Sequence, residues 1–284
     1  LVSIPDGLVY IVPAAGYYYD YLNCRYLYDS WTPAQIGNEK FEENDPAILG
    51  GMFAVWNDHA GNGITVKDIH DRLFPALQTL SAKCWTGAAT SFSFEDFNRL
   101  RLALSEAPAV NEAARWQKGK QLRIETLNPG QTTGEKEVGY GYRVEFTIEG
   151  ADEPKGTVLF SSDNATFYLS DPESGQLGFA HEGYLNKFNY RVEKGKKVTL
   201  AITGDNRKTC LYVDGKLREE LGPITLYAMQ QKDLATFQKS DAAATQPIVY
   251  NPSAKMYYQR TLVFPLQKAG DFKSRITGVK VEQK

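Results

Sequence analysis

The residue pattern of the chain changes after Pro108, and this change constrains the fold more than any other feature of the sequence. Before it, apolar residues recur at helical spacing; after it, short β-rich segments follow one another between turns. These segments are residues 141–149, 157–161, 166–170, 188–193, 197–203, 209–213 and 259–265. Many short strands at close spacing are typical of an antiparallel sandwich. The sequence therefore predicts two domains, residues 1–106 and 107–284, of which the second is all-β.

Two helices are predicted in the first domain from their start signals. Thr65 stands three positions before Asp68, and Ser93 three before Asp96, which is the spacing of an N-cap and its third helical residue. In the first of these helices, apolar residues recur every three or four positions, at Ile69, Leu73, Leu77, Leu80 and Cys84. The first domain is thus predicted to run, in order, as strand, loop, strand, helix and helix.

The second of the predicted strands ends in residues that suit a sugar. Residues 50–56 carry no charge, as expected of a strand buried on both faces. In α/β proteins, functional groups follow the carboxyl ends of such strands, and here Trp56 is followed two positions later by Asp58. An indole can stack on a pyranose ring while a carboxylate accepts hydrogen bonds from its hydroxyls. The alternative is that Trp56 belongs to the core and Asp58 caps the next loop.

Composition argues against several classes of function. The net charge of -2 argues against nucleic acid as a partner, because phosphate neutralisation needs clustered Lys and Arg. Cysteines and histidines, three of each, stand in no metal-ligand or disulfide spacing, so no metal or other cofactor is predicted. No apolar run is long enough to span a membrane, and no signal peptide is visible. Because the chain starts at Leu1, directly in sequence typical of a folded domain, we expect a fragment of a longer protein.

Two ordered motifs in the first half resemble the C-terminal end of a glycoside hydrolase family 20 catalytic barrel. Pro13 followed by Tyr18-Tyr19-Asp20 is similar to the family's Tyr-x-Asp at strand seven. Leu49-Gly50-Gly51 followed by Trp56-Asn57-Asp58 is similar to its Leu-Gly-Gly and Trp-x-acid at strand eight. Trp31 stands where the family places another pocket tryptophan. The resemblance implies that the first domain is the C-terminal portion of an (α/β)8 TIM barrel, with strands seven and eight and the last helices.

This resemblance implies a retaining, substrate-assisted glycosidase that acts on terminal β-linked N-acetylhexosamine. The 2-acetamido oxygen of the sugar would attack its own anomeric carbon and form an oxazolinium intermediate. Tyr18 would be the catalytic donor to the acetamide carbonyl, with Trp31 and Trp56 as cage and platform. Asp20 and Asp58 would bind sugar hydroxyls. The partners implied are a glycan substrate and the rest of the chain's own barrel upstream, and the compartment implied is extracellular or periplasmic.

The sequence departs from the family at two points. The family's catalytic Asp-Glu pair belongs on strand four, whereas the only Asp-Glu here is Asp152-Glu153, in a loop-like segment of the second half. We therefore expect the chain alone to lack the general acid. Asp58 stands where exo-acting hexosaminidases usually have Glu, and in this it resembles the family's lacto-N-biosidases, which release a disaccharide.

The second half resembles a concanavalin A-like, laminin G-type jelly roll. The resemblance rests on the segments 197–202, 211–216 and 276–281, with Asp214-Gly215 as a hairpin turn. Domains of this fold include both sugar binders and plain spacers. A non-catalytic carbohydrate-binding segment is therefore the alternative to the glycosidase.

Overall fold

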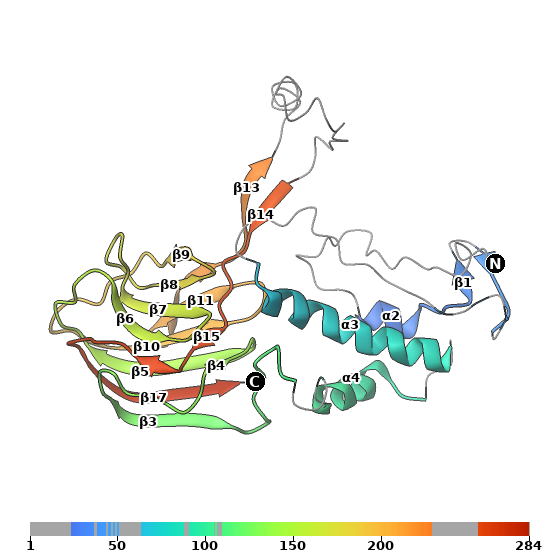
Figure 1. The fold of residues 1–284 in the computed structure, drawn as a ribbon, viewed down its shortest axis with the longest axis horizontal. Coiled ribbons are helices and arrows are strands. Elements are labelled where there is room, and N and C mark those ends of the chain that lie inside the picture. The colour runs from blue at the N-terminus through green and yellow to red at the C-terminus, as the bar shows by residue number, and fades with distance from the viewer. Residues whose placement is uncertain are drawn as a thin grey trace, which may run out of the picture. The chain divides into compact units, whose positions relative to one another are not determined.

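The computed structural model describes residues 24–36, 39–43, 45–46, 48, 50, 64–87, 91–104, 106, 110–228 and 255–283. The chain divides into two compact units, Leu1–Ala60 with Ile69–Glu112 and Gly61–Asp68 with Ala113–Lys284. The ribbon of each unit can be followed in Figure 1. Both strands predicted in the first domain lie largely or wholly outside the described residues.

The first unit is mainly helical in its described part. Its elements are α2 (Cys24–Asp29), β1 (Gln35–Ile36), β2 (Glu39–Lys40), α3 (Val66–Thr86) from Ile69 onward, and α4 (Phe94–Ala103). The predicted cap of the second helix is confirmed, because the Ser93 Oγ accepts a hydrogen bond from the N–H of Asp96 at 3.1 Å. Tyr28 of α2 stacks on Phe97 of α4 with ring centroids 4.5 Å apart.

The predicted apolar stripe of α3 is only partly buried. Leu80 packs in a small cluster with Leu27, Trp31 and Ala76. Leu77, however, is 47% exposed. Most of the fully buried positions of the helix are polar, namely Asp68, Arg72, Thr79 and Lys83. Apolar spacing thus predicted the helix correctly but did not predict which of its sides is covered.

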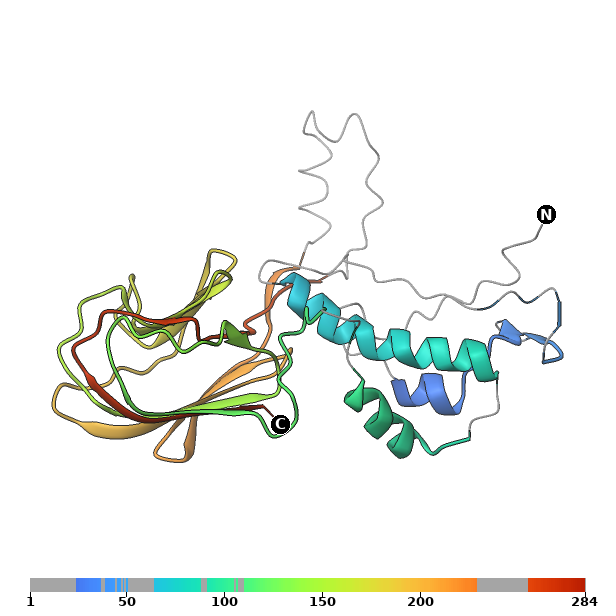
Figure 2. The ribbon, with the colours of Figure 1, turned by 60° about the horizontal axis from the view of Figure 1, so that its bottom comes forward.

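The second unit is a sandwich of two antiparallel β-sheets, as the short strands predicted, and Figure 2 shows the two layers. The six-stranded sheet has the order β12 (Lys216–Leu221), β11 (Thr209–Val213), β10 (Lys197–Gly204), β5 (Tyr142–Glu149), β17 (Arg275–Gln283) and β3 (Gln121–Leu127). The five-stranded sheet has the order β16 (Lys268–Ala269), β6 (Thr157–Ser161), β7 (Ala165–Ser170), β8 (Gly178–His181) and β9 (Tyr184–Lys187). Two further pairs are β15 (Phe264–Pro265) with β4 (Glu137–Val138), and β13 (Ile224–Ala228) with β14 (Lys255–Tyr258). This arrangement is consistent with a jelly-roll sandwich.

Alternation along the strands builds the core between the sheets. In β5 the inward positions Tyr142, Val144, Phe146 and Ile148 are at most 2% exposed, and the residues between them are partly exposed. Phe264 lies among rings from both sheets, with centroids 5.7 Å from Tyr142 and 5.2 Å from Phe167. A large aromatic core of this kind supplies most of the favourable free energy of folding.

Two glycine-containing features set the register of the six-stranded sheet. At the predicted hairpin turn, Asp214 and Gly215 both have positive φ, 48° and 78°, which is the backbone that an Asp-Gly two-residue turn requires. Within β17, Gly278 has φ 62° and lies at a bulge against β5. The extra residue lets Ile276 and Val279 both reach the core although they are three positions apart.

Two predicted strands are corrected by the structure. Residues 188–193 are not a strand, because the N–H of Tyr190 bonds back to the carbonyl of Phe188 at 2.7 Å and breaks the extended ladder. The neighbouring strand is β9, which ends at Lys187. Of the segment 259–265, only Phe264 and Pro265 are paired, in β15.

Candidate functional site

The outer face of the five-stranded sheet consists of two cross-strand rows of side chains. One row is Val158, Tyr168, Gly178 and Lys187. The other is Lys268, Ser161, Thr166, Ala180 and Leu185. Partners in register share a face of the sheet, and the alternate residues Phe167 and Leu169 are buried in the core. We call these two rows the outer face; apart from Gly178, all of its residues are at least partly exposed.

Tyr168 is the aromatic residue of the outer face, and its neighbours are small. Gly178 stands opposite it on β8, where a Cβ would lie 2.6 Å from the carbonyl oxygen of Asn186. A larger residue therefore does not fit at this position without a backbone shift. Because glycine has no side chain, no side chain stands opposite Tyr168 on β8 in this row. A half-buried ring in such a setting can receive the apolar face of a flat ligand.

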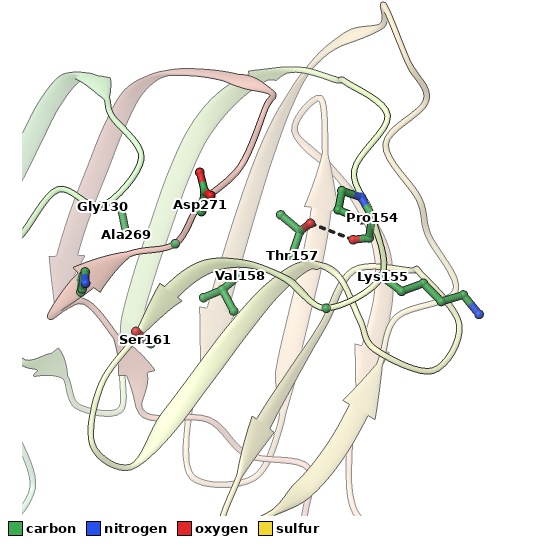
Figure 3. Close-up of a pocket in the computed structure, with 11 residues that line it drawn as sticks. Gly130, Pro154, Lys155, Thr157, Val158, Ser161, Ala269 and Asp271 are labelled. Atoms are coloured by element: carbon green, nitrogen blue, oxygen red, sulfur yellow. Dashed lines mark hydrogen bonds between the residues drawn. The ribbon is translucent and has the colours of Figure 1, made fainter.

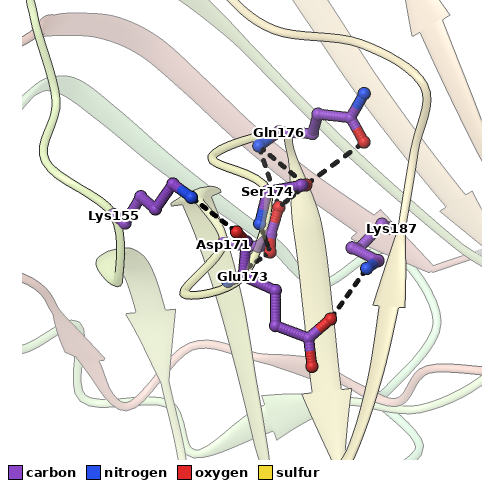
Figure 4. Close-up of polar contacts among 6 residues, drawn as sticks. All are labelled: Lys155, Asp171, Glu173, Ser174, Gln176 and Lys187. Carbon is purple, nitrogen blue, oxygen red and sulfur yellow. Dashed lines mark hydrogen bonds and ion pairs between the residues drawn. The ribbon is translucent and has the colours of Figure 1, made fainter.

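The loop after β7 is organised by the buried carboxylate of Asp171 (Figure 4). Its Oδ1 accepts from the N–H groups of Glu173 at 2.8 Å and Ser174 at 2.7 Å. Its Oδ2 accepts from the N–H of Gln176 at 2.8 Å and from the Ser174 hydroxyl. Burial alone raises the pKa of the Asp171 carboxyl, but these hydrogen bonds outweigh burial and hold its pKa below the usual range.

Two lysines contact this loop at Glu173, as Figure 4 shows. Lys155 donates to the carbonyl oxygen of Glu173 at 2.6 Å, and Lys187 pairs with the Glu173 carboxylate at 2.8 Å. The hydrogen bond to Glu173 raises the pKa of Lys187. Lys187 lies in the same row as Tyr168, two strands away with Gly178 between them, so its ion pair with Glu173 stands at the end of that row.

A pocket of about 470 Å³ opens at the β6 and β16 end of this face (Figure 3). Val158, Ser161 and Lys268 belong to both the pocket and the outer face, and Asp271 adds a carboxylate. At this pocket β16 is only two residues long, and the chain after it passes very close to β6. At Gly270 a Cβ would lie 2.2 Å from the carbonyl oxygen of Val158, so only glycine fits there.

The outer face of the six-stranded sheet offers less to a ligand. Its charges neutralise one another, with Arg143 paired to Glu145 at 2.5 Å and Lys280 to Glu282 at 2.6 Å. Its aromatic residue Tyr212 has the Arg143 guanidinium over the ring, 5.5 Å from the centroid. The five-stranded sheet is therefore the better candidate for binding.

Of the five site residues predicted in the first half, the structure describes Trp31 alone. Trp31 is 6% exposed and packs with Leu27, Ala76 and Leu80. Its indole N–H finds no hydrogen-bond partner within the described part of the chain. Tyr18, Asp20, Trp56 and Asp58 lie outside the described residues, so their predicted roles stay predictions.

The Asp152-Glu153 pair has a structural role at Glu153. One oxygen of its carboxylate accepts from the N–H groups of Lys273 at 2.9 Å and Ser274 at 2.6 Å, and from the Ser274 hydroxyl at 2.7 Å. A carboxylate that binds several donors in this way fixes a loop. It is ill suited to deliver a proton to a leaving group.

Sequence reasoning missed the outer face, although one signal for it was present. In the segment 165–170, Thr166 and Tyr168 alternate with Ala165, Phe167 and Leu169. This alternation places a tyrosine on the face of the strand opposite to the core. What the sequence did not show is that Gly178 and Lys187 would stand in one row with that tyrosine, because this depends on the strand register.

The described residues contain no group of three or more His, Cys, Asp or Glu side chains placed to hold a metal ion. Nor does any helix in the described part of the chain have the length and apolar character needed to cross a membrane.

The fold defines a class, the antiparallel β-sandwich domains. No family model and no curated protein matches the chain. Among solved structures, it is similar to the galectin LEC-6 of Caenorhabditis elegans, with 8% identity and a TM-score of 0.35, over 57% of this chain and 96% of the galectin. It is also similar to domain 4 of AbnA, a GH43 extracellular arabinanase of Geobacillus stearothermophilus in complex with arabinotriose, with 12% identity and a TM-score of 0.28, over 57% and 65% of the two chains. It is similar as well to Trypanosoma rangeli sialidase, with 15% identity and a TM-score of 0.27, over 50% of this chain and 20% of the sialidase. Similarity at this level identifies neither a family nor a ligand for this chain.

Proposed function

We propose that the β-sandwich binds carbohydrate on the outer face of its five-stranded sheet, without performing catalysis itself. The observation that carries this proposal is the placement of Tyr168 beside Gly178, with the edge pocket at one end of the same face. A sugar ring has apolar C–H faces and a rim of hydroxyls. It therefore needs a platform and a few polar groups that accept and donate.

The polar groups around Tyr168 meet this need. Glu173 and Asp271 offer carboxylate oxygens that accept from hydroxyls, and Lys187 and Ser161 offer donors. Because the Asp171 loop is fixed by its own hydrogen bonds, the backbone of Glu173 is held in place before a ligand arrives. A pre-organised site of this kind loses little conformational entropy on binding.

Replacing Tyr168 by Ala is expected to weaken glycan binding about thirtyfold or more, because truncating a central aromatic anchor typically costs about 2 kcal/mol or more. The ligand is first selected on a glycan array and then titrated against the purified chain by calorimetry. Tyr212→Ala, on the outer face of the other sheet, is the matched control and should leave the Kd within about twofold. If Tyr168→Ala folds and binds as the wild type does, or if the wild type binds no glycan on the array, the proposal is wrong.

A second function is proposed for the longer protein from which this chain would come. It rests on the ordered pair of motifs, Tyr18 with Asp20 and Trp56 with Asp58. We propose that these residues belong to the end of a family 20-like TIM barrel that hydrolyses terminal β-linked N-acetylhexosamine by the substrate-assisted route. In this proposal Tyr18 donates to the acetamide carbonyl, and the general acid comes from the upstream part of the barrel. Asp58 stands where exo-acting hexosaminidases usually have Glu. It therefore favours an alternative form of this proposal, in which the enzyme releases a lacto-N-biose disaccharide.

Replacing Asp58 by Asn in the full-length enzyme is expected to lower kcat/KM about ten- to a hundredfold, since a charge-assisted hydrogen bond typically contributes about 1.5 to 3 kcal/mol. The substrates are an aryl β-N-acetylhexosaminide and an aryl lacto-N-bioside. Asp163→Ala, at an exposed loop position in the sandwich, is the control and should not change the rate.

Residues 1–284 alone should show no turnover, because they lack the general acid. A folded full-length protein that is inactive on both substrates would contradict this second function.

A further inference from the structure

The buried carboxylate of Asp68 ties residues 65–68 to the strands of the sandwich, within the second unit. Its Oδ2 accepts from the N–H of Thr65 at 2.9 Å and from the Thr65 hydroxyl at 2.7 Å. The Thr65 hydroxyl oxygen in turn accepts from the N–H of Asp68 at 3.1 Å, which completes the predicted capping box. Oδ1 of Asp68 accepts from the hydroxyls of Tyr140 at 2.6 Å and Thr261 at 2.8 Å. We call these four residues the Asp68 network.

His181, the last residue of β8, has a buried imidazole without a hydrogen-bond partner. The side chain is 4% exposed, and its ring stacks beside that of Phe179 with centroids 6.0 Å apart. Neither Nδ1 nor Nε2 finds a partner within the described part of the chain. A neutral imidazole has one donor and one acceptor, whereas an imidazolium has two donors and a charge. Burial without acceptors therefore opposes the charged form more than the neutral one.

The strand register places His181 beside the Asp68 network. His181 pairs with the first residue of β7, and Asn164, just before that strand, donates to Oε2 of Glu137 at 3.3 Å. The other carboxylate oxygen of Glu137 pairs with Lys67 at 2.7 Å, one residue before Asp68. Electrostatics agree with this placement, because burial lowers the pKa of His181 while the charge of Asp68 opposes the lowering.

The other titratable groups around His181 come from its own hairpin and from the network. Glu182 follows it, and the charge of Glu182 also opposes the lowering of the pKa. Tyr184 stands opposite His181 on β9, with its ring 6.0 Å from that of Tyr258. Burial raises the pKa of Tyr258, and it raises that of Tyr140 well above the usual value. Both hydroxyls therefore stay protonated in mildly acidic solution, where an imidazole ordinarily gains its proton.

The end of the β8–β9 hairpin can adjust when His181 gains a charge. The two-residue turn that follows His181 is Glu182-Gly183, and both residues have positive φ, 48° and 78°. Gly adopts this backbone freely, but a glutamate is disfavoured there, which makes the turn less stable. β9 is also the last strand in the order of its sheet. The imidazole thus lies at a part of the sandwich that opens more easily than the core.

We propose that His181 is a pH-sensitive switch that releases the Asp68 network in mildly acidic solution. The imidazolium attracts the carboxylate of Asp68 and needs an acceptor for each N–H. A carboxylate has about four acceptor positions, and Asp68 already accepts four hydrogen bonds. The protonated ring can therefore bind Asp68 only if Tyr140, Thr261 or Thr65 gives up its place. This switch belongs to the sandwich itself and depends on neither proposed function.

Proton linkage gives the direction of the effect. The pKa of His181 is lowered while the network is intact, so the released form binds more protons. The intact network is therefore fully favoured above the ordinary pKa of about 6.5 and loses stability as the pH falls below it. For one proton, the equilibrium shifts by at most about tenfold for each pH unit.

Hydrogen–deuterium exchange of the whole chain tests the switch at about pH 7.5, 6.5 and 5.5. Protection factors, which correct for the intrinsic pH dependence of exchange, are compared for residues 64–70, 178–187 and the core strand β10. In the wild type, protection of residues 64–70 should change by no more than about twofold between the two higher pH values. It should then fall several-fold, and at most about tenfold, at the lowest, while β10 stays constant.

Three variants isolate the imidazole. His181→Phe keeps a ring beside Phe179 and should remove the acid-induced fall, and His181→Gln, a second uncharged replacement, should do the same. His70→Gln is the matched control, because the His70 imidazole pairs with Glu106 in the first unit. It should keep the fall seen in the wild type.

Three results would overturn the proposal. One is a wild type in which residues 64–70 lose no more protection than β10. Another is the same fall in a folded His181→Phe or His181→Gln protein, since a different group would then be titrating. The third is a loss confined to residues 178–187, which would mean that His181 gains its proton without displacing a donor from Asp68.

Discussion

Replacing Asp68 by Ala is expected to lower the free energy of unfolding of the β-sandwich by about 3 to 5 kcal/mol. The substitution removes the acceptor that Asp68 offers to the N–H of Thr65 in the capping box, and such a hydrogen bond is typically worth about 1 kcal/mol. It also leaves the hydroxyls of Tyr140 and Thr261 buried without an acceptor, at about 1 to 3 kcal/mol each. These effects share one carboxylate and will not add in full.

Urea denaturation followed by circular dichroism measures this change. Asp163→Ala is the control, because Asp163 is exposed in the turn between β6 and β7 and its loss should change stability by no more than about 0.5 kcal/mol. If Asp68→Ala costs no more than Asp163→Ala, then the Asp68 hydrogen bonds contribute nothing to the stability of the folded state.

Replacing Asp171 by Ala is expected to cost about 3 kcal/mol, because three backbone N–H groups and one hydroxyl lose their shared acceptor. Asp171→Asn keeps the shape and part of the acceptor capacity, so its cost should be smaller. The loop also carries Glu173, so both variants should weaken glycan binding. Asp171→Ala, the less stable of the two, should weaken it more than Asp171→Asn.

The cost of Asp171→Asn should depend on pH with a definite sign. The pKa of Asp171 is lower in the folded than in the unfolded protein, so the ionised carboxylate stabilises the fold above the unfolded pKa of about 3.9. This contribution is lost as the pH falls through the lower, folded-state pKa. The difference in unfolding free energy between wild type and Asp171→Asn should be constant from about pH 7 to 5 and shrink below about pH 4. A difference that grows in acid would mean that the folded-state pKa is raised instead.

Local signals in the sequence predicted local structure well. Ser93 with Asp96 and Thr65 with Asp68 gave the two helix starts, and Asp214-Gly215 gave a hairpin. Each is a short-range effect, in which a side chain or a backbone conformation satisfies its own neighbours. Alternation in β5 is of the same local kind, because a strand with one buried face must place every second residue in the core.

Features that depend on pairing between distant segments could not be predicted in the same way. The outer face needs Tyr168, Gly178 and Lys187 in one row, and that row is set by three strands and two turns. Residues 188–193 have the composition of a strand but are turned by a local hydrogen bond at Tyr190. In α3, tertiary contacts bury Asp68 and Lys83 while Leu77 stays exposed, which hydrophobic spacing alone does not indicate.

The position of β17 has a consequence for how the domain is made in the cell. β17 is translated after all other strands of the six-stranded sheet, yet it lies between β5 and β3 and pairs with both. Val281 stands opposite Val144 on one side and Leu122 on the other, so each pairing closes a very long stretch of chain. Until residues 275–283 have been synthesised, the facing edges of β3 and β5 have no partner and can pair with other chains. The sandwich therefore completes its fold only after β17 has been translated, and until then these two strand edges are open to aggregation.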